Sequence, residues 1–193
     1  MPIMHKLGTF EVASGKMIVS DPCYTVSSDN IAKNICDLSA VIEVDNGVWH
    51  AYVYESNWAK VCKIVIHHNN IQLNDVYFSE VAIAQIGVDS GQAGFFDSKH
   101  YRDDLIVGNS KVMKFGMSND GDKWYNMCCY ATLKSKTAGG GVLYGSLSQS
   151  GHGDGCYNVY PGYHKSDADD TKLLALQILF ARDEPSSDSD SDW

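Results

Sequence analysis

Three short stretches of the sequence combine acidic side chains with glycine or serine, a composition that often marks binding or catalytic loops. The first is SDPCY at residues 20–24, where Asp21 offers a carboxylate as a ligand or base and Cys23 offers a thiol. A thiol nucleophile needs a neighbouring base, and this stretch contains no histidine. A turn at the end of a strand accounts for the same residues, because an Asp before Pro favours an extended residue that leads into a turn.

The second stretch, GVDSGQAGFFD at residues 87–97, places two carboxylates around small residues. Asp89 precedes Ser90 and Gly91, and Asp97 ends the stretch. Two such carboxylates could hold a divalent cation or divide acid and base roles between them. A tight turn in which Asp89 caps backbone N–H groups is the competing interpretation, and the sequence leaves both open.

The third stretch, SGHGDGCYNVYPGY at residues 150–163, alternates His152 and Asp154 with glycines that include Gly153. Successive backbone N–H groups in such a loop can surround an anion, and the ring of Tyr157 can stack on a ligand. Zinc needs three or four donors, so His152 and Asp154 alone would bind it weakly. A glycine-rich turn in which Asp154 bonds its own backbone explains the same residues without a ligand.

Established catalytic motifs are absent from the sequence. It contains no nucleophile elbow, zinc-protease helix, P-loop or dinucleotide fingerprint. His67 and His68 are adjacent in a predicted strand, so their side chains point to opposite faces and cannot both chelate one ion. An enzyme is therefore the weakest of the functional predictions.

The elements that must position these loops are mostly strands, because apolar residues recur with period two along much of the chain. Residues 48–55 illustrate the pattern, with Trp49, Ala51 and Val53 alternating with His50, Tyr52 and Tyr54. The predicted strands are Leu7–Val12, Lys16–Ser20, Val48–Glu55, Val61–His68, Val81–Ile86, Trp124–Leu133, Gly141–Leu147, Tyr157–Tyr160 and Lys172–Phe180, the first two forming a hairpin around Ser14–Gly15.

Two segments have the features of short helices. Asp29–Cys36 begins with Asp29 as a candidate N-cap, and Ser98–Val107 follows Asp97, so that Asp97 or Ser98 can cap its first turn. Short strands with two short helices predict a mainly β fold, either an antiparallel sandwich or a partly closed barrel. Residues 1–182 are predicted to form a single β-rich domain.

The net charge of −9 is concentrated near the C-terminal end of the sequence. The tail Asp183–Trp193 carries five acids and no base, which leaves 15 bases and 19 acids, a net charge of −4, in residues 1–182. The tail is predicted to be disordered, because its composition cannot bury enough apolar surface, and either to solubilise the protein or to dock on a partner through Trp193. The body has no cluster of lysine and arginine, which argues against nucleic acid as a partner.

Several patterns bear on the cellular location. No apolar run approaches the roughly 18 residues of a membrane span, and the start MPIMHKLGTF lacks the apolar core of a secretory signal. The six cysteines form no C-x-x-C pair and are expected to be free thiols in a reducing compartment. The predicted location is the cytoplasm, with no membrane association.

The three stretches occur in an order that resembles a known pattern. An SGK and DP opening within Gly8–Pro22, then VDSG and FFD in Val88–Asp97, then SGxGDGxY in Ser150–Gly162 resemble a bacterial family catalogued as a domain of unknown function. The resemblance spans about residues 7–180, and EVAIAQIG fits the strand that precedes the VDSG block. No secure activity is known for that family, so the resemblance implies no catalytic residue. Cys23 and His152 depart from the apolar and aromatic residues common at their positions, which favours packing or stacking for His152.

These observations predict a binding module in which the three loops form a pocket at one end of the β framework. A small polar ligand or divalent cation would be held there by the loop residues Asp21, Asp89, Ser90, Gly91, Asp97, His152, Gly153 and Asp154, while Phe95 and Tyr157 stack on it. The prediction requires the four aspartates to converge.

Two alternatives stay open. In the first, the chain is an interaction or inhibitor protein in phage–host or toxin–immunity conflict, which engages a basic partner through the tail Asp183–Trp193. In the second, it is a metal-assisted hydrolase with Asp89 or Asp154 as base or metal ligand and His152 as proton shuttle.

Overall fold

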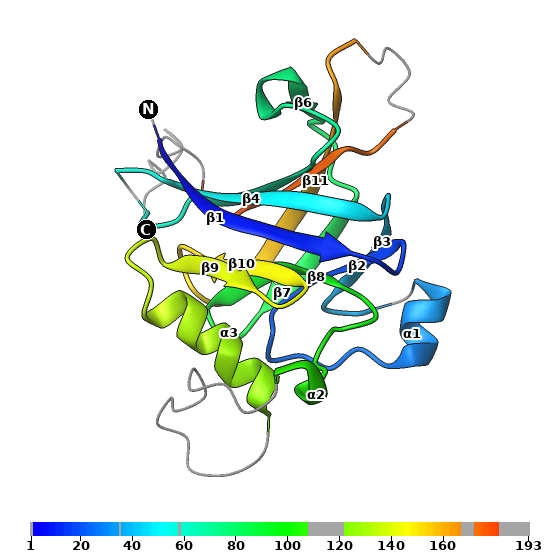
Figure 1. Cartoon of the computed structure of the whole chain (residues 1–193). Helices are drawn as coiled ribbons and strands as arrows, with labels where there is room; N and C mark the ends of the chain where they lie inside the picture. Colours follow the sequence, from blue (N-terminus) through cyan, green and yellow to red (C-terminus); the bar gives the residue numbers. More distant parts are fainter. Residues whose placement is uncertain (1, 35, 58, 108–121, 167–171, 182–193) are drawn as a thin grey trace, which may run out of the picture.

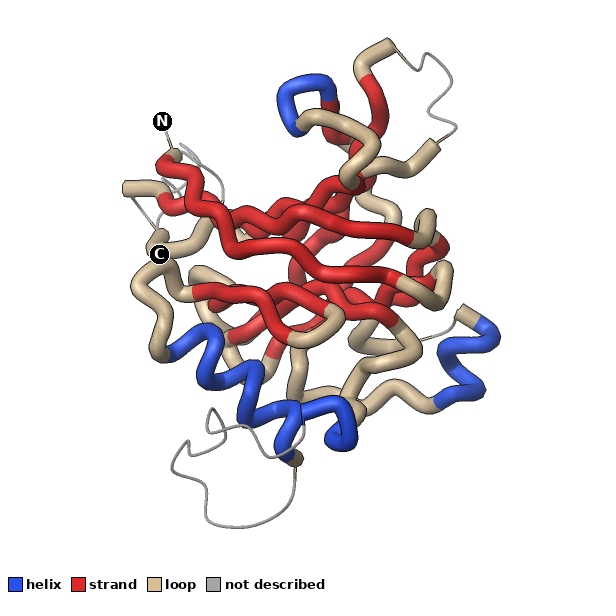
Figure 2. The backbone as a smooth tube through the Cα atoms, viewed as in Figure 1, coloured by secondary structure: helices blue, strands red, loops and turns tan. Residues whose placement is uncertain are grey.

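Two antiparallel β-sheets pack face to face in the computed structural model, which describes residues 2–34, 36–57, 59–107, 122–166 and 172–181 (Figures 1 and 2). The large sheet has the order β1 (Ile3–Val12), β4 (Gly47–Glu55), β5 (Lys63–His68), β12 (Ala175–Leu179), β11 (Gly155–His164) and β6 (Val76–Phe78), with β7 (Ala84–Val88) also paired to β11. The small sheet has the order β3 (Ala40–Glu43), β2 (Lys16–Ser20), β8 (Gln92–Asp97), β10 (Gly145–Gln149) and β9 (Gly139–Val142). The predicted mainly β sandwich is confirmed, and the described strands close no barrel.

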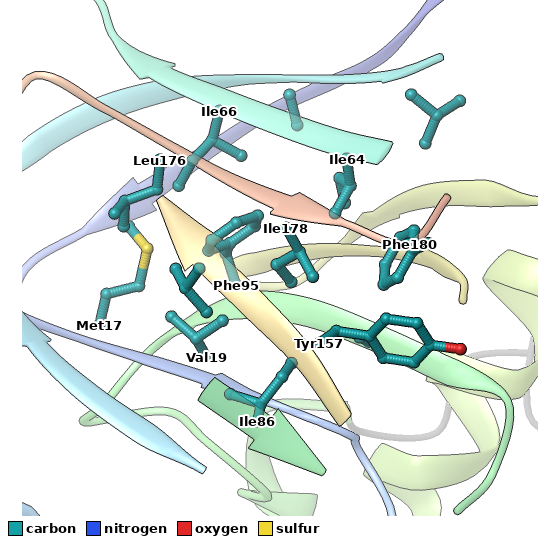
Figure 3. Packing of buried hydrophobic residues seen from close by; sticks show 14 of the residues in the cluster. Met17, Val19, Ile64, Ile66, Ile86, Phe95, Tyr157, Leu176, Ile178 and Phe180 are labelled. Carbon is teal, nitrogen blue, oxygen red and sulfur yellow. The ribbon is translucent and has the colours of Figure 1, made fainter. Parts of the chain in front are cut away.

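The main core fills the space between the two sheets (Figure 3). The predicted alternation of β4 is confirmed, since Trp49, Ala51 and Val53 are buried in this core. The other sheet contributes residues such as Met17, Val19 and Phe95, and the figure also labels Ile64, Ile66, Ile86, Tyr157, Leu176, Ile178 and Phe180. Phe95 is fully buried in this core, so the expectation that its ring stacks on a ligand is wrong.

The predicted strand Trp124–Leu133 is wrong, because these residues form most of helix α3 (Lys123–Leu133). Trp124, Met127 and Cys128 are buried at helical spacing and pack on the outer face of the small sheet. Asp122 caps the helix, because its side chain accepts a hydrogen bond from the N–H of Tyr125 at 2.9 Å. The spacing of apolar residues in this segment is compatible with a strand or with a helix, and the contacts with the sheet favour the helix.

The predicted hairpin around Ser14–Gly15 is also wrong, although both of its strands form. β1 pairs with β4 in the large sheet, whereas β2 pairs with β3 and β8 in the small sheet. The turn therefore carries the chain from one sheet to the other. The alternation of residues predicts a strand but contains no information about which strand pairs with it.

Three strands were not predicted: β3, β6 and β8. β8 is the middle strand of the small sheet, and all six of its residues are buried, because the core covers one face and α3 the other. A strand that is buried on both faces has no polar alternation. Gly94 is required there, because a Cβ would lie only 2.5 Å from the Cβ of Leu147.

The predicted single strand Gly141–Leu147 is wrong, because its residues belong to β9 and β10, which pair as a hairpin around Leu143 and Tyr144. The remaining predicted elements form with shifted bounds. Helix α1 covers Ser28–Lys33 and is capped by Ser27, whose Oγ accepts from the N–H of Asn30 at 3.1 Å, in place of Asp29. Only the last part of the predicted helix Ser98–Val107 forms, as helix α2 at Asp104–Val107. A short 3-10 helix, η1 (Leu73–Asp75), precedes β6. The described part of the chain thus has a third α-helix, α3, besides the two helices that were predicted.

All six cysteines lie in the described part and are free thiols, as predicted. None of the described helices has both the length and the apolar character that crossing a membrane requires. The tail Asp183–Trp193, which was predicted to be disordered or to dock on a partner, lies outside the described residues.

Candidate functional site

Asp21 joins the DP loop to the VDSG turn, and its carboxylate is fully buried. Its Oδ1 accepts hydrogen bonds from the N–H of Cys23 at 2.8 Å and from the hydroxyl of Ser90 at 2.6 Å. Its Oδ2 accepts from the N–H groups of Asp89 at 2.8 Å and Ser90 at 2.6 Å. Four donors around one buried carboxylate form a tie between two loops that are almost seventy residues apart in the chain.

The third stretch joins the same cluster through its backbone. The N–H of Ser150 donates to the carbonyl of Gly91 at 3.0 Å. The hydroxyls of Ser150 and Tyr157 both donate to the carbonyl of Gly153, at 2.7 and 2.8 Å. The three stretches therefore meet at one end of the sandwich. We call this arrangement, formed by residues 20–24, 89–91 and 150–157, the loop cluster.

The four aspartates do not all meet within the loop cluster. Asp97 ends β8, five residues after Gln92, which places it about 17 Å along the strand at about 3.4 Å per residue. Its Oδ1 accepts from the N–H groups of Ala13 and Ser14 at 3.2 and 3.0 Å and from the Ser14 hydroxyl at 2.5 Å. Asp97 thus stabilises the turn that connects the two sheets. Asp89, His152 and Asp154 are exposed on the loop cluster.

The loop cluster offers little that could act as a nucleophile or hold a metal. Burial first, then a hydrogen bond to Asp21 and the charges of Asp21 and Asp89, raise the pKa of the Cys23 thiol to about 12. Burial and a hydrogen bond to Asp89 likewise raise the pKa of Tyr24. Among the described residues, no three or more His, Cys, Asp or Glu side chains are placed to hold a metal ion.

A different feature of the large sheet has the form of a binding site. A groove of about 620 Å³ lies on the outer face of β1, β4 and β5, within the range of about 300–1,000 Å³ that small-molecule pockets occupy. Its floor includes Lys6, His50, Tyr52 and His67, and the segment 69–78, which contains η1 and β6, forms a wall. Figure 1 shows η1 and β6 at the top, on the side of the molecule away from α3. We call this cavity the His67 groove.

His67 is the most distinctive residue of the His67 groove. The residue is 5% exposed, and its Nδ1–H donates to the backbone carbonyl of His68 at 3.0 Å. Because that carbonyl can only accept, the tautomer with the proton on Nδ1 is the one that fits, and this tautomer has its lone pair on Nε2. Nε2 is buried and has no hydrogen-bond partner among the described residues. A buried acceptor without a partner is costly unless something outside the chain satisfies it.

The rings around His67 form a parallel stack. The His67 ring lies 5.0 Å from the His50 ring at 17° and 5.7 Å from the Tyr52 ring at 10°. The register places His50 opposite His67 on neighbouring strands. Desolvation first, then the charges of His67, Lys6 and His68, lower the pKa of His50, so its ring is neutral at physiological pH. His50 Nδ1 is a second buried ring nitrogen with no partner among the described residues.

Two other cavities lack this combination. One of about 640 Å³ lies between α3 and β9 and is lined by apolar groups such as Met127, Ala131 and Val142. One of about 250 Å³ lies beside α1 and the DP loop. Compared with these two cavities, the His67 groove differs in being lined by residues that have a buried polar atom without a partner in the described part of the chain.

No motif in the sequence predicts the His67 groove, although one signal of it is present. In a half-buried strand, the outward positions are usually small polar or charged residues, whereas here they are His50, Tyr52 and Tyr54. Such amphipathic rings on an outward face are typical of a surface that contacts something. His67 could not be added to them without the register of β4 and β5.

Neither a scan of protein-family models nor searches of curated proteins and of solved structures found a match for the chain. The resemblance to the family of unknown function therefore stays a prediction.

Proposed function

We propose that this protein is a binding module that holds a small polar ligand in the His67 groove. The observation that carries the proposal is the buried Nε2 of His67, which has no partner among the described residues and lines a groove of ligand size. A ligand N–H or O–H that donates to this nitrogen would remove the cost of an unsatisfied buried acceptor. The parallel rings of His50 and Tyr52 hold the acceptor in place.

Placing the ligand in this groove changes the site that the sequence predicts but keeps the predicted class of function. In the loop cluster, the carboxylate of Asp21 already accepts four hydrogen bonds, so it has little capacity left for a ligand. Asp89 and Asp154 are exposed and could contact a ligand, so the loop cluster is the competing location for the binding site.

A thermal-shift panel of nucleotides, sugars, amino acids and small carboxylates tests the proposal on the whole chain. We expect at least one class to raise the Tm of the wild type and to have a reduced effect on His67→Phe, which keeps a ring but removes the acceptor. Asp154→Asn is the matched control, because it changes an exposed loop-cluster residue.

NMR chemical-shift mapping with the same compound places the ligand even if His67→Phe folds poorly. Shifts confined to Lys6, His50 and His67 support the groove. Shifts confined to Asp89 and Asp154, or a loss of binding in Asp154→Asn alone, would overturn it in favour of the loop cluster. A panel without any stabilising compound would contradict binding of these classes altogether.

A further inference from the structure

The charge of the His67 groove differs in sign from that of the whole chain. The net charge of the sequence is −9, yet the groove is lined by Lys6 and Lys165 and by no aspartate or glutamate. Neither lysine forms an ion pair with a described residue. Two acidic residues are neighbours in the chain of lining residues: Glu55, next to Tyr54, is bonded to His5 at 3.2 Å, and Asp75, between Asn74 and Val76, is exposed and does not line the groove. Such a groove attracts anions and disfavours cations.

The two lysines retain donors for an anion. The Nζ of Lys165 donates one hydrogen bond, at 2.5 Å, to the backbone carbonyl of Asn74 in the groove wall. An ammonium group has three donors, so two remain on Lys165. Lys6 is exposed on β1, opposite Tyr52 in the register, which places it at the end of the ring stack. Together they supply positive charge from two separate elements.

The ring stack provides a surface for a planar group. Tyr52 and His67 lie within 10° of parallel, and Tyr54 and Phe78 add further aromatic lining. Aromatic faces accept planar rings in offset stacking, and the interaction adds to the burial of apolar area. The lone pair of the unpartnered Nε2 points along the plane of the His67 ring, so a ligand ring that satisfies it must meet His67 edge-on and carry a donor.

From these three features, and resting on the proposed function, we infer that the ligand is a small anion joined to a planar ring that carries an N–H or O–H group. The anion lies against Lys6 and Lys165, the ring lies on the face of Tyr52 and in the plane of the His67 ring, and the donor at the ring's edge bonds to Nε2 of His67. Two sources supply this chemistry: nucleoside monophosphates and hydroxylated aromatic carboxylates.

Isothermal titration of the full chain with whole probes and with their fragments tests the inference. The first arm uses 5′-AMP, 5′-GMP, adenosine and ribose 5-phosphate, and the second uses 4-hydroxybenzoate, benzoate and phenol. We expect one arm to contain a whole probe that binds about tenfold tighter than either of its fragments, and the arm that does so identifies the source.

Substitution of the lysines supplies the second readout. The double variant Lys6→Met, Lys165→Met is expected to bind the whole probe about tenfold more weakly and to bind the neutral fragment with unchanged affinity. Added salt should reduce the difference in affinity between wild type and variant. Lys99→Met is the matched control, because Lys99 is exposed and does not line the groove.

The outcomes separate this inference from the proposed function. If adenosine or phenol binds as tightly as its charged counterpart, and His67→Phe removes that binding, the anion inference is overturned while the groove remains a binding site. If no charged probe in either arm binds at millimolar concentration, the inference is overturned as well. If the charged probes bind equally well to the lysine variant, their binding is elsewhere and the inference also fails.

Discussion

At the scale of single residues, the acidic side chains of the sequence motifs are used mainly by the fold itself. Asp21 and Asp97 are fully buried, and each accepts several hydrogen bonds from loops that are distant in sequence. A buried carboxylate surrounded by backbone N–H groups has a structural role. The residue type alone does not distinguish such an aspartate from one that binds a metal or a substrate. The sequence could therefore identify these residues as important without assigning them a role.

Asp21→Asn is expected to destabilise the protein by about 3 kcal/mol. An asparagine has one acceptor oxygen where Asp21 has two, so its NH₂ group would face the N–H groups of either Cys23 or Asp89 and Ser90. Urea unfolding measures the change in the free energy of unfolding. Asp154→Asn, which makes the same chemical change at an exposed position, should shift it by less than about 0.5 kcal/mol. Equal stability of the two variants would show that Asp21 does not tie the loops together.

At the scale of elements, the existence of most strands was predictable and their partners were not. The alternation of Val48–Glu55 locates β4 and its buried face correctly, because that strand has one face in the core. β8 has both faces buried and lacks the signal. The apolar residues of Lys123–Leu133 are spaced in a way that fits a strand or a helix, and the packing of this segment on β9 and β10 favours a helix. Pairing of β1 with β4, in place of β2, depends on contacts across the whole fold.

Two glycines of the loop cluster make a matched test of its backbone geometry. Gly151 and Gly153 both have positive φ values, +69° and +92°. A Cβ at Gly151 would overlap the carbonyl oxygen of Val61, whereas a Cβ at Gly153 would have no atom within 4 Å. Gly153→Ala should therefore cost about 1 kcal/mol for the left-handed conformation alone.

Gly151→Ala should cost about 3 kcal/mol or more, because strain and overlap add together. Chemical denaturation of the two variants gives the difference directly. Similar losses for both would mean that the third stretch does not pack against Val61 as the structure has it.

At the scale of the whole molecule, the two outer faces of the sandwich differ. α3 packs on the outer face of the small sheet and buries Trp124, Phe96 and Leu147 there (Figure 1). On the large sheet, the outer face of β1, β4 and β5 has polar rings and the His67 groove. The groove is built from residues at positions 6, 50, 67 and 165, which are brought together by the order of strands. A site assembled in this way has no local motif, so the sequence did not predict it.

The pH dependence of global stability provides a test of the environment of His50. Its pKa in the native state is lowered from 6.5, mainly by desolvation and next by the charge of His67, so between that lowered value and pH 6.5 the unfolded chain binds more protons than the native chain. The free energy of unfolding must then fall as the pH falls through this window, and the contribution of His50 is constant above it.

His50→Gln removes the titrating group, so its free energy of unfolding should fall less than that of the wild type when the pH is lowered from about 7.5 to about 5. Urea midpoints at the two pH values measure this difference. His152→Gln, at an exposed position of the loop cluster, is the control and should follow the wild type. If His50→Gln loses as much stability as the wild type over this range, the native environment does not oppose protonation of His50, and the description of a desolvated ring in the groove is incorrect.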